Sequence, residues 1–217
     1  MSAYDKHTFG MFQTLFDELG IAAAFEPQLG RIVLFSGFLV LRQSTRKSHF
    51  HTDFSHTNGK AFTLMTPLQD MADLQNCHLL AKLPLVQPLE REPEREPERE
   101  AARASQGAED KHVLMQFRYQ LGRAICLGDG FIHATETGDS PRPLAFLCFT
   151  FGAASLTAEE WASAEGYISQ QGPIYADPTG LLVQSSSFAT PAATPPDPQF
   201  VGTSAVHNSV RRGLYAD

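Results

Sequence analysis

Short apolar runs bounded by turn residues dominate the middle of this sequence and limit the folds open to it. The runs form an early group and a late group: residues 32–35, 38–41 and 62–65, then 113–119, 124–127 and 144–151. Ser36-Gly37 and Asn58-Gly59 precede the second and third runs, as expected of strands joined by tight turns. Helical segments do not alternate with the runs, which argues against a doubly wound parallel sheet. The pattern predicts an antiparallel β-barrel or sandwich.

One helix is predicted before the strands. Five apolar residues recur there at spacings of three and four: Phe9, Phe12, Leu15, Phe16 and Leu19. This spacing is typical of an amphipathic helix, and Gly20 is expected to end it. The predicted fold class is therefore mainly β, a barrel with an N-terminal helix packed on it.

The chain is long enough for one sizeable domain, which we predict over residues 1–180. Within it, residues 90–101 repeat the pattern Glu-Arg-Glu-Pro or Glu-Arg-Glu-Ala and offer no large apolar side chain to a core. Residues 88–110 are accordingly predicted to be a flexible, charged surface insertion. Residues 181–217 are rich in Pro, Ser and Ala and are predicted to form a C-terminal tail.

Charge and hydropathy indicate which partners to expect. The formal net charge is −7, so the chain lacks the overall basic character that attracts nucleic acid or anionic membranes. The N-terminus resembles neither a signal peptide nor a transit helix, and no apolar run is long enough to span a membrane. A cytoplasmic protein is the expectation. The oligomeric state leaves no readable signature.

Potential metal ligands concentrate in the segment His49-Phe50-His51-Thr52-Asp53. Side chains alternate along an extended chain, so His51 and Asp53 are expected on one face, with Phe50 and Thr52 on the other. A third ligand has to come from elsewhere. His133, which follows the turn Gly128-Asp129-Gly130, is the best placed.

Two imidazoles and one carboxylate leave coordination positions open on an octahedral ion. That arrangement suits Fe(II), which can then bind a bidentate co-substrate and O2 together. A structural zinc site is usually closed by four protein ligands, often cysteines, and the three cysteines of this chain are badly spaced for one. His51, Asp53 and His133 are therefore predicted to be the ligands of a catalytic non-haem metal.

The order of these residues resembles that of the Fe(II)/2-oxoglutarate-dependent dioxygenases, which have the double-stranded β-helix fold. The resemblance covers roughly residues 31–152 and rests on His51-x-Asp53, the strand that follows, and His133 about eighty residues later. It implies hydroxylation of a substrate by O2, coupled to conversion of 2-oxoglutarate to succinate and CO2. It also implies Fe(II) as the metal and ascorbate as a stimulating reductant. The substrate is not identified.

The same resemblance implies a basic residue that binds the far carboxylate of 2-oxoglutarate. Arg142, nine residues after His133, matches by spacing, and its guanidinium can bind a carboxylate through two hydrogen bonds. Flanking prolines at 141 and 143 and Leu144, where family members often have a hydroxyl residue, depart from the pattern. Lys60 and Arg123 are the alternative anchors.

Two other functions remain open at the level of sequence. A cupin has the same barrel and would use His49, His51 and His133 without 2-oxoglutarate; Gly122 and the residues 128–133 resemble its second motif. No glutamate follows His49 at the spacing of its first motif. A non-catalytic barrel, in which the charged insertion and the tail bind partners, is the third possibility.

Overall fold

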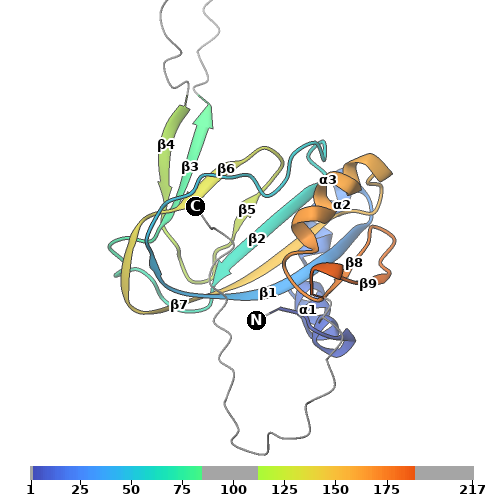
Figure 1. The fold of residues 1–217 in the computed structure, drawn as a ribbon, viewed down its shortest axis with the longest axis horizontal. Coiled ribbons are helices and arrows are strands. Elements are labelled where there is room, and N and C mark those ends of the chain that lie inside the picture. Colours follow the sequence, from blue (N-terminus) through green and yellow to red (C-terminus); the bar gives the residue numbers. More distant parts are fainter. Residues whose placement is uncertain (1, 85–111, 189–217) are drawn as a thin grey trace, which may run out of the picture.

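The computed structural model describes residues 2–84 and 112–188, and two antiparallel sheets face each other in it (Figure 1). The larger sheet has the order β1-β7-β2-β5, formed by Ile32–Thr45, Gly138–Ala153, Ala61–Pro67 and Ile125–Leu127. The smaller sheet has the order β4-β3-β6, formed by His112–Phe117, Leu79–Pro84 and Ile132–Thr135. An isolated bridge between His51 and His133 adds one more chain segment beside β6.

The chain path identifies the barrel. From β1 the chain crosses to the bridge at His51 in the other sheet, returns to β2 and crosses again to the β3–β4 pair. It then passes through β5, β6 and β7, changing sheet each time. Two antiparallel sheets connected in this way form a jelly roll, also called a double-stranded β-helix. The predicted mainly-β fold class is confirmed.

Strand β7 shows why its sequence is an almost uninterrupted apolar run. Leu147, Phe149 and Phe151 belong to a core cluster on the outer face of the larger sheet. Leu144, Phe146 and Cys148 point to the opposite face, into the barrel, and belong to a second cluster. Both faces are covered, so neither set of alternating positions has to be polar.

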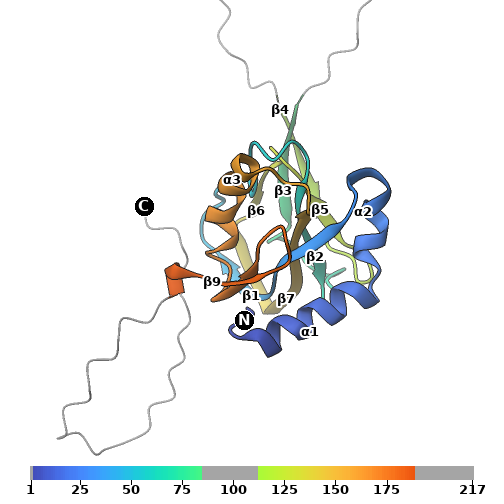
Figure 2. The ribbon, with the colours of Figure 1, turned by 90° about the vertical axis from the view of Figure 1, so that its right-hand side faces the viewer.

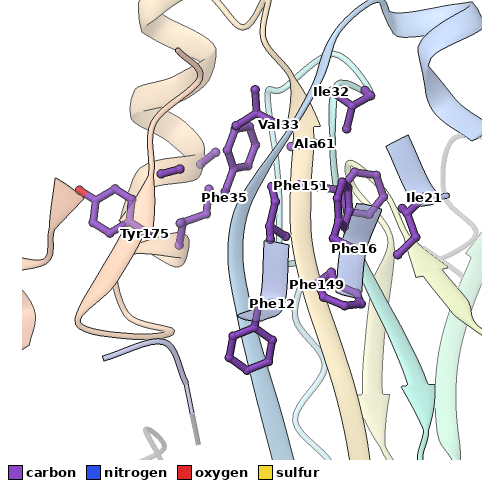
Figure 3. Close-up of a cluster of buried hydrophobic side chains, with 14 of the residues drawn as sticks. Phe12, Phe16, Ile21, Ile32, Val33, Phe35, Ala61, Phe149, Phe151 and Tyr175 are labelled. Atoms are coloured by element: carbon purple, nitrogen blue, oxygen red, sulfur yellow. The ribbon is translucent and has the colours of Figure 1, made fainter. Parts of the chain in front are cut away.

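Helices cover the outer face of the larger sheet (Figure 2). Phe12 and Phe16 of α1 (Lys6–Glu18) pack in the outer cluster with Phe149 and Phe151 (Figure 3). The Asp5 side chain caps α1 by accepting a hydrogen bond from the Thr8 backbone N–H. The predicted N-terminal helix is therefore confirmed in its position on the sheet.

Two helices and four strands go beyond the predicted elements; β3 and β6 of the smaller sheet are two of these strands. Gly20, with φ of 65°, separates α1 from a second helix, α2 (Ile21–Leu29). Helix α3 (Ala158–Ile168) follows β7, and a small hairpin of β8 (Ile174–Ala176) and β9 (Leu182–Gln184) comes next. A 3-10 turn at Ser186–Phe188 ends the described chain.

The predicted turn at Ser36-Gly37 is wrong. Strand β1 runs through both residues, and its pairing with β7 shifts register between Leu34 and Ser36. Gly37 is needed for packing, because a Cβ atom there would lie 2.4 Å from Cγ of Phe12. Ser36 and Gly37 resemble a turn in the sequence, but these small residues are explained by a bulge and by a close contact with the helix.

Two predicted regions lie at the limits of the described structure. Residues 88–110, the predicted insertion, lie outside the described residues, as does the tail beyond residue 188. The first residues of the predicted tail contain β9, which pairs with β8. Among the described residues, no helix has the length and apolar character needed to cross a membrane.

Candidate metal centre

His51 and His133 are brought together by the backbone. Each donates its N–H to the carbonyl oxygen of the other, at 2.9 Å in both directions. Residues paired in this way in an antiparallel ladder place their side chains on the same face. The two imidazole ring centroids lie 4.4 Å apart.

Asp53 completes the group. Its Oδ1 atom lies 3.6 Å from Nε2 of His51 and 3.6 Å from Nε2 of His133. The three possible ligand atoms lie within 4.8 Å of one another, and no second group of this kind occurs among the described residues. The chain around His51 forms only a single bridge instead of the regular strand we expected, yet the predicted alternation still places His51 and Asp53 on one side.

Each histidine is held in the orientation that suits metal binding. Nδ1 of His51 lies 3.0 Å from the His49 carbonyl oxygen, and Nδ1 of His133 lies 3.0 Å from that of Phe131. A carbonyl oxygen only accepts, so Nδ1 carries the proton in both rings. Nε2 of each ring therefore carries the lone pair, and it faces Asp53, where an ion would bind.

The donor set fits a divalent transition metal. Ligand bonds of about 2.1 Å place adjacent donors of an octahedral ion roughly 3 Å apart, so the observed 3.6 Å separations require only a small contraction. Asp53 is 7% exposed and His133 is 6% exposed. Burial lowers the pKa of His133, against the opposing effect of the Asp53 charge, so the neutral imidazole that a metal requires is favoured.

Helix α3 contributes a tyrosine to the surroundings of Asp53. The Tyr167 ring packs edge-on against Phe54, with centroids 5.4 Å apart. Burial raises the pKa of Tyr167 well above its usual value, and the charge of the neighbouring Asp53 carboxylate raises it further. Tyr167 therefore stays protonated beside the carboxylate.

The same helix fixes the loop that follows Asp53. Nζ of Lys60 lies 2.9 Å from both Glu160 carboxylate oxygens, and Nδ2 of Asn58 donates to Glu160 Oε1 at 2.7 Å. Ser163 donates to the Ser55 carbonyl oxygen at 2.8 Å. The interaction with Lys60, followed by hydrogen bonds from Thr157 and Asn58, lowers the pKa of Glu160 to about 2.

Such restraint is needed because the loop is conformationally unusual. His56, Asn58 and Gly59 have φ values of 63°, 53° and 71°. Left-handed conformations are unfavourable for residues other than glycine, and a surrounding structure has to maintain them. The contacts with α3 supply that support directly behind the candidate metal ligand.

Arg42 is a cationic residue that the sequence analysis did not identify. It lies on β1 opposite Leu144, which is buried inside the barrel, and its Nη1 donates to Oγ1 of Thr135. Thr135 lies two residues after His133 and therefore on the same face of β6. The alternation of Phe38, Val40 and Arg42 along the strand is the signal that would have shown Arg42 to point inward.

The surroundings of Cys148 place Arg42 and Asp53 around the same interior. Burial raises the pKa of the Cys148 thiol to about 12; the Arg42 charge lowers it and the Asp53 charge raises it. The Tyr119 hydroxyl is buried in this region without a hydrogen-bond partner in the described structure. The Arg42 charge lowers the pKa of this hydroxyl too. A cation and an unsatisfied hydroxyl are thus available inside the barrel.

The basic residues that were predicted from the sequence to bind 2-oxoglutarate do not lie beside Arg42. Arg142 is paired with Asp73, at 2.7 and 2.9 Å, and donates to the Asp70 carbonyl oxygen at 2.8 Å. Lys60 is paired with Glu160, and Arg123 is exposed. His49 stacks beside His51 at 6.2 Å but is outside the group of converging donor atoms.

Comparisons with known proteins give similarity at the level of fold. No family model and no curated protein matches the sequence. The epimerase SnoN, solved with Fe3+, alpha ketoglutarate and nogalamycin RO, has a TM-score of 0.46 and 18% identity over 67% of this chain and 60% of that one. A 2OG-Fe(II) oxygenase family oxidoreductase from Burkholderia pseudomallei has a TM-score of 0.41 and 12% identity, with coverage of 64% and 55%.

A third structure, the non-heme monooxygenase ThoJ in a complex with Ni, has a TM-score of 0.42 and 12% identity, with coverage of 63% and 51%. This chain thus spans between about half and three fifths of the length of these proteins.

Proposed function

We propose that this chain is a non-haem Fe(II)- and 2-oxoglutarate-dependent oxygenase. The observation that carries the proposal is the convergence of two Nε2 atoms and one buried carboxylate on a single point, with three ligands from the protein and no fourth among the described residues. Fe(II) held there supplies the hydroxylation of a C–H bond by O2, with 2-oxoglutarate giving succinate and CO2. One oxygen atom enters the substrate and the other enters succinate.

The residues of the chain bind the metal, orient its ligands and exclude water. His51, Asp53 and His133 hold the metal, while the Nδ1–H···O bonds and the Tyr167 hydroxyl keep these ligands oriented. The buried position of Asp53 and His133 limits the access of water. These are roles in binding, orientation and exclusion of solvent.

Arg42 is our proposed anchor for the far carboxylate of 2-oxoglutarate. It contacts Thr135, whose Cα is roughly 7 Å along β6 from that of His133, a separation comparable to the length of a five-carbon dicarboxylate. The hydroxyl groups of Thr135 and Tyr119 would bind the same carboxylate together with the Arg42 guanidinium. Arg142 remains the alternative suggested by sequence spacing, although its guanidinium is occupied by Asp73.

The metal assignment is tested by anaerobic titration with Fe(II) and Mn(II), followed by measurement of succinate release in the presence of Fe(II), ascorbate and 2-oxoglutarate. Wild-type protein is expected to bind one ion and to release succinate slowly even without substrate. Asp53→Ala should abolish both, whereas Asp17→Asn, an exposed carboxylate on α1, should change neither. Metal binding that survives Asp53→Ala but is lost in His49→Ala would support the cupin alternative instead. Absence of stoichiometric metal would leave a non-catalytic barrel.

The anchor is tested by comparing two arginine variants. Loss of a charge-assisted hydrogen bond is expected to raise the KM for 2-oxoglutarate at least about tenfold in Arg42→Gln, with metal affinity nearly unchanged. Arg142→Gln should retain the wild-type KM, since its partner is Asp73. The reverse result would transfer the anchor to Arg142.

A further inference from the structure

The smaller sheet extends one face away from the metal ligands. Strand β3 pairs Ala81 with His133 on one side and with Met115 of β4 on the other. Directly paired residues point to the same side of a sheet. Met115, Ala81, His133 and His51 therefore form one cross-strand row on the interior face.

The neighbouring row on β3 and β4 is apolar. Leu83 pairs with Val113 and lies two residues beyond Ala81, so both residues continue the same face. On the other side of Ala81, Leu79 and Phe117 belong to the interior cluster, which confirms that this face is turned into the barrel. Every side chain on the β3 and β4 part of this face is uncharged.

Within residues 2–84 and 112–188, part of this face is left open. Val113 is 44% exposed and Met115 is 41% exposed, although both are on the side that the barrel usually buries. The β3–β4 hairpin projects past the end of the larger sheet in both views (Figure 1, Figure 2), so the facing sheet does not cover it. Exposed apolar side chains of this kind on an interior face indicate a binding surface.

We propose that Leu83, Val113 and Met115, here called the apolar wall, bind a neutral, apolar small-molecule substrate beside the metal. This rests on the proposed function, which it deepens by naming a substrate class. The wall continues the row that contains His133 and His51, so a molecule lying on it is on the same face of the sheet as these two candidate ligands.

The uncharged side chains of the wall favour a neutral substrate over an ionic one. Lys82 lies on the opposite face of β3, where its Nζ is 4.9 Å from the centroid of the Phe50 ring. Arg42 contacts Thr135 deeper in the barrel. Since the wall itself offers no charged partner, transfer of an ionic group onto it would be costly, whereas an apolar ring or chain gains from burial.

The test uses indole as a neutral aromatic probe and full-length protein. Saturation-transfer NMR on the metal-free protein measures contact with the wall and does not depend on catalysis. Line broadening of the indole signals by Mn(II)-loaded protein then measures proximity to the metal. Val113→Thr combined with Met115→Gln should weaken indole binding about tenfold and remove the broadening.

The matched control is Leu114→Gln. Leu114 is 59% exposed on the same strand but points to the opposite face, so this variant should bind indole as the wild type does. Equal loss in both variants, or binding of indole without broadening, overturns the proposal. A dimer in solution that Met115→Gln converts to a monomer also overturns it, because the wall would then be a protein interface. Indole binding without any uptake of Mn(II) would instead count against the metal centre alone.

Discussion

Tyr167 illustrates how a single residue outside the ligand set controls the candidate metal centre. Its ring packs against Phe54, and the Asp53 charge raises the pKa of its hydroxyl, so Tyr167 is a neighbour of both the carboxylate and the chain that carries it. Partners of this kind orient metal ligands and are worth roughly 10- to 100-fold in metal affinity. Tyr167→Phe is therefore expected to weaken Mn(II) binding by about that factor, as measured by titration.

Tyr175→Phe is the control for this prediction. The Tyr175 hydroxyl donates to Glu165 at 2.8 Å, on the outer side of the protein core, and has no contact with Asp53. Its removal should leave Mn(II) affinity unchanged. Equal Mn(II) affinity in Tyr167→Phe and wild-type protein would show that the Asp53 orientation does not depend on the phenol.

Gly37 is a second position where a single added atom is expected to change the free energy of unfolding. A Cβ there would lie 2.4 Å from Cγ and 2.5 Å from Cβ of Phe12, atoms too close to the α1 backbone to move freely. Gly37→Ala should lower the free energy of unfolding by about 1–3 kcal/mol through overpacking. Gly10→Ala, exposed within α1 with no atom near its added Cβ, should raise it by up to about 1 kcal/mol. Denaturant titrations of both variants give the comparison, and a neutral Gly37→Ala would mean that α1 shifts easily.

At the scale of elements, α3 acts as the support of the metal loop. Glu160 is 6% exposed, and its carboxylate receives hydrogen bonds from Lys60, Asn58 and Thr157. Because its pKa falls from 4.5 to about 2 on folding, the charged form stabilises the fold fully above pH 4.5. That contribution is lost as the pH falls from 4.5 towards 2.

Glu160→Gln keeps the shape of the capping residue and removes only the charge. At pH 7 the variant should have a lower Tm than the wild type and weaker Mn(II) binding, and the Tm difference should shrink between pH 4.5 and pH 2. Glu159→Gln, exposed in the same helical turn, should match the wild type at each pH. A Tm difference that is constant with pH would show that the Glu160 charge does not stabilise the fold.

The elements also show which parts of the structure were readable in the sequence. Runs such as residues 62–65 and 144–151 lie in strands because their apolar side chains cannot be left in water, and the predicted helix on residues 9–19 follows from its periodicity. Strand β1 appeared as two strands because Ser36 and Gly37 serve a bulge and a helix contact that are set by distant parts of the chain. No local pattern reports such a tertiary requirement.

The candidate site also contains residues whose positions could be predicted from the sequence and residues whose positions could not. His51 and Asp53 are two residues apart, so local geometry alone predicts that they share a face. The position of His133 beside them depends on the bridge that places His51 next to β6, and the position of Arg42 depends on the register of β1 against β7. Spacing after His133 pointed to Arg142, whereas the structure pairs that residue with Asp73.

At the scale of the whole molecule, the two strands that flank residues 85–111 are paired with each other up to their ends. Pro84 and His112 are directly paired at the ends of β3 and β4, so a short turn can connect them. The pairing of β3 with β6 and the bridge to His51 do not involve residues 85–111. The three metal ligands should therefore form independently of this part of the chain.

We accordingly predict that replacing residues 85–111 by a four-residue turn containing Asn-Gly preserves the metal centre. Mn(II) affinity and the binding of indole to the apolar wall should equal those of the wild type. The free energy of unfolding should rise by roughly 1–2 kcal/mol, because closing a shorter loop costs less conformational entropy. Calorimetry and metal titration of the shortened protein test this, with a variant of equal length, in which residues 90–101 are replaced by a Gly/Ser sequence, as the control for composition. Lost metal binding in the shortened protein but not in the Gly/Ser variant would show that the length of the connection, and so the position of β4, supports the site.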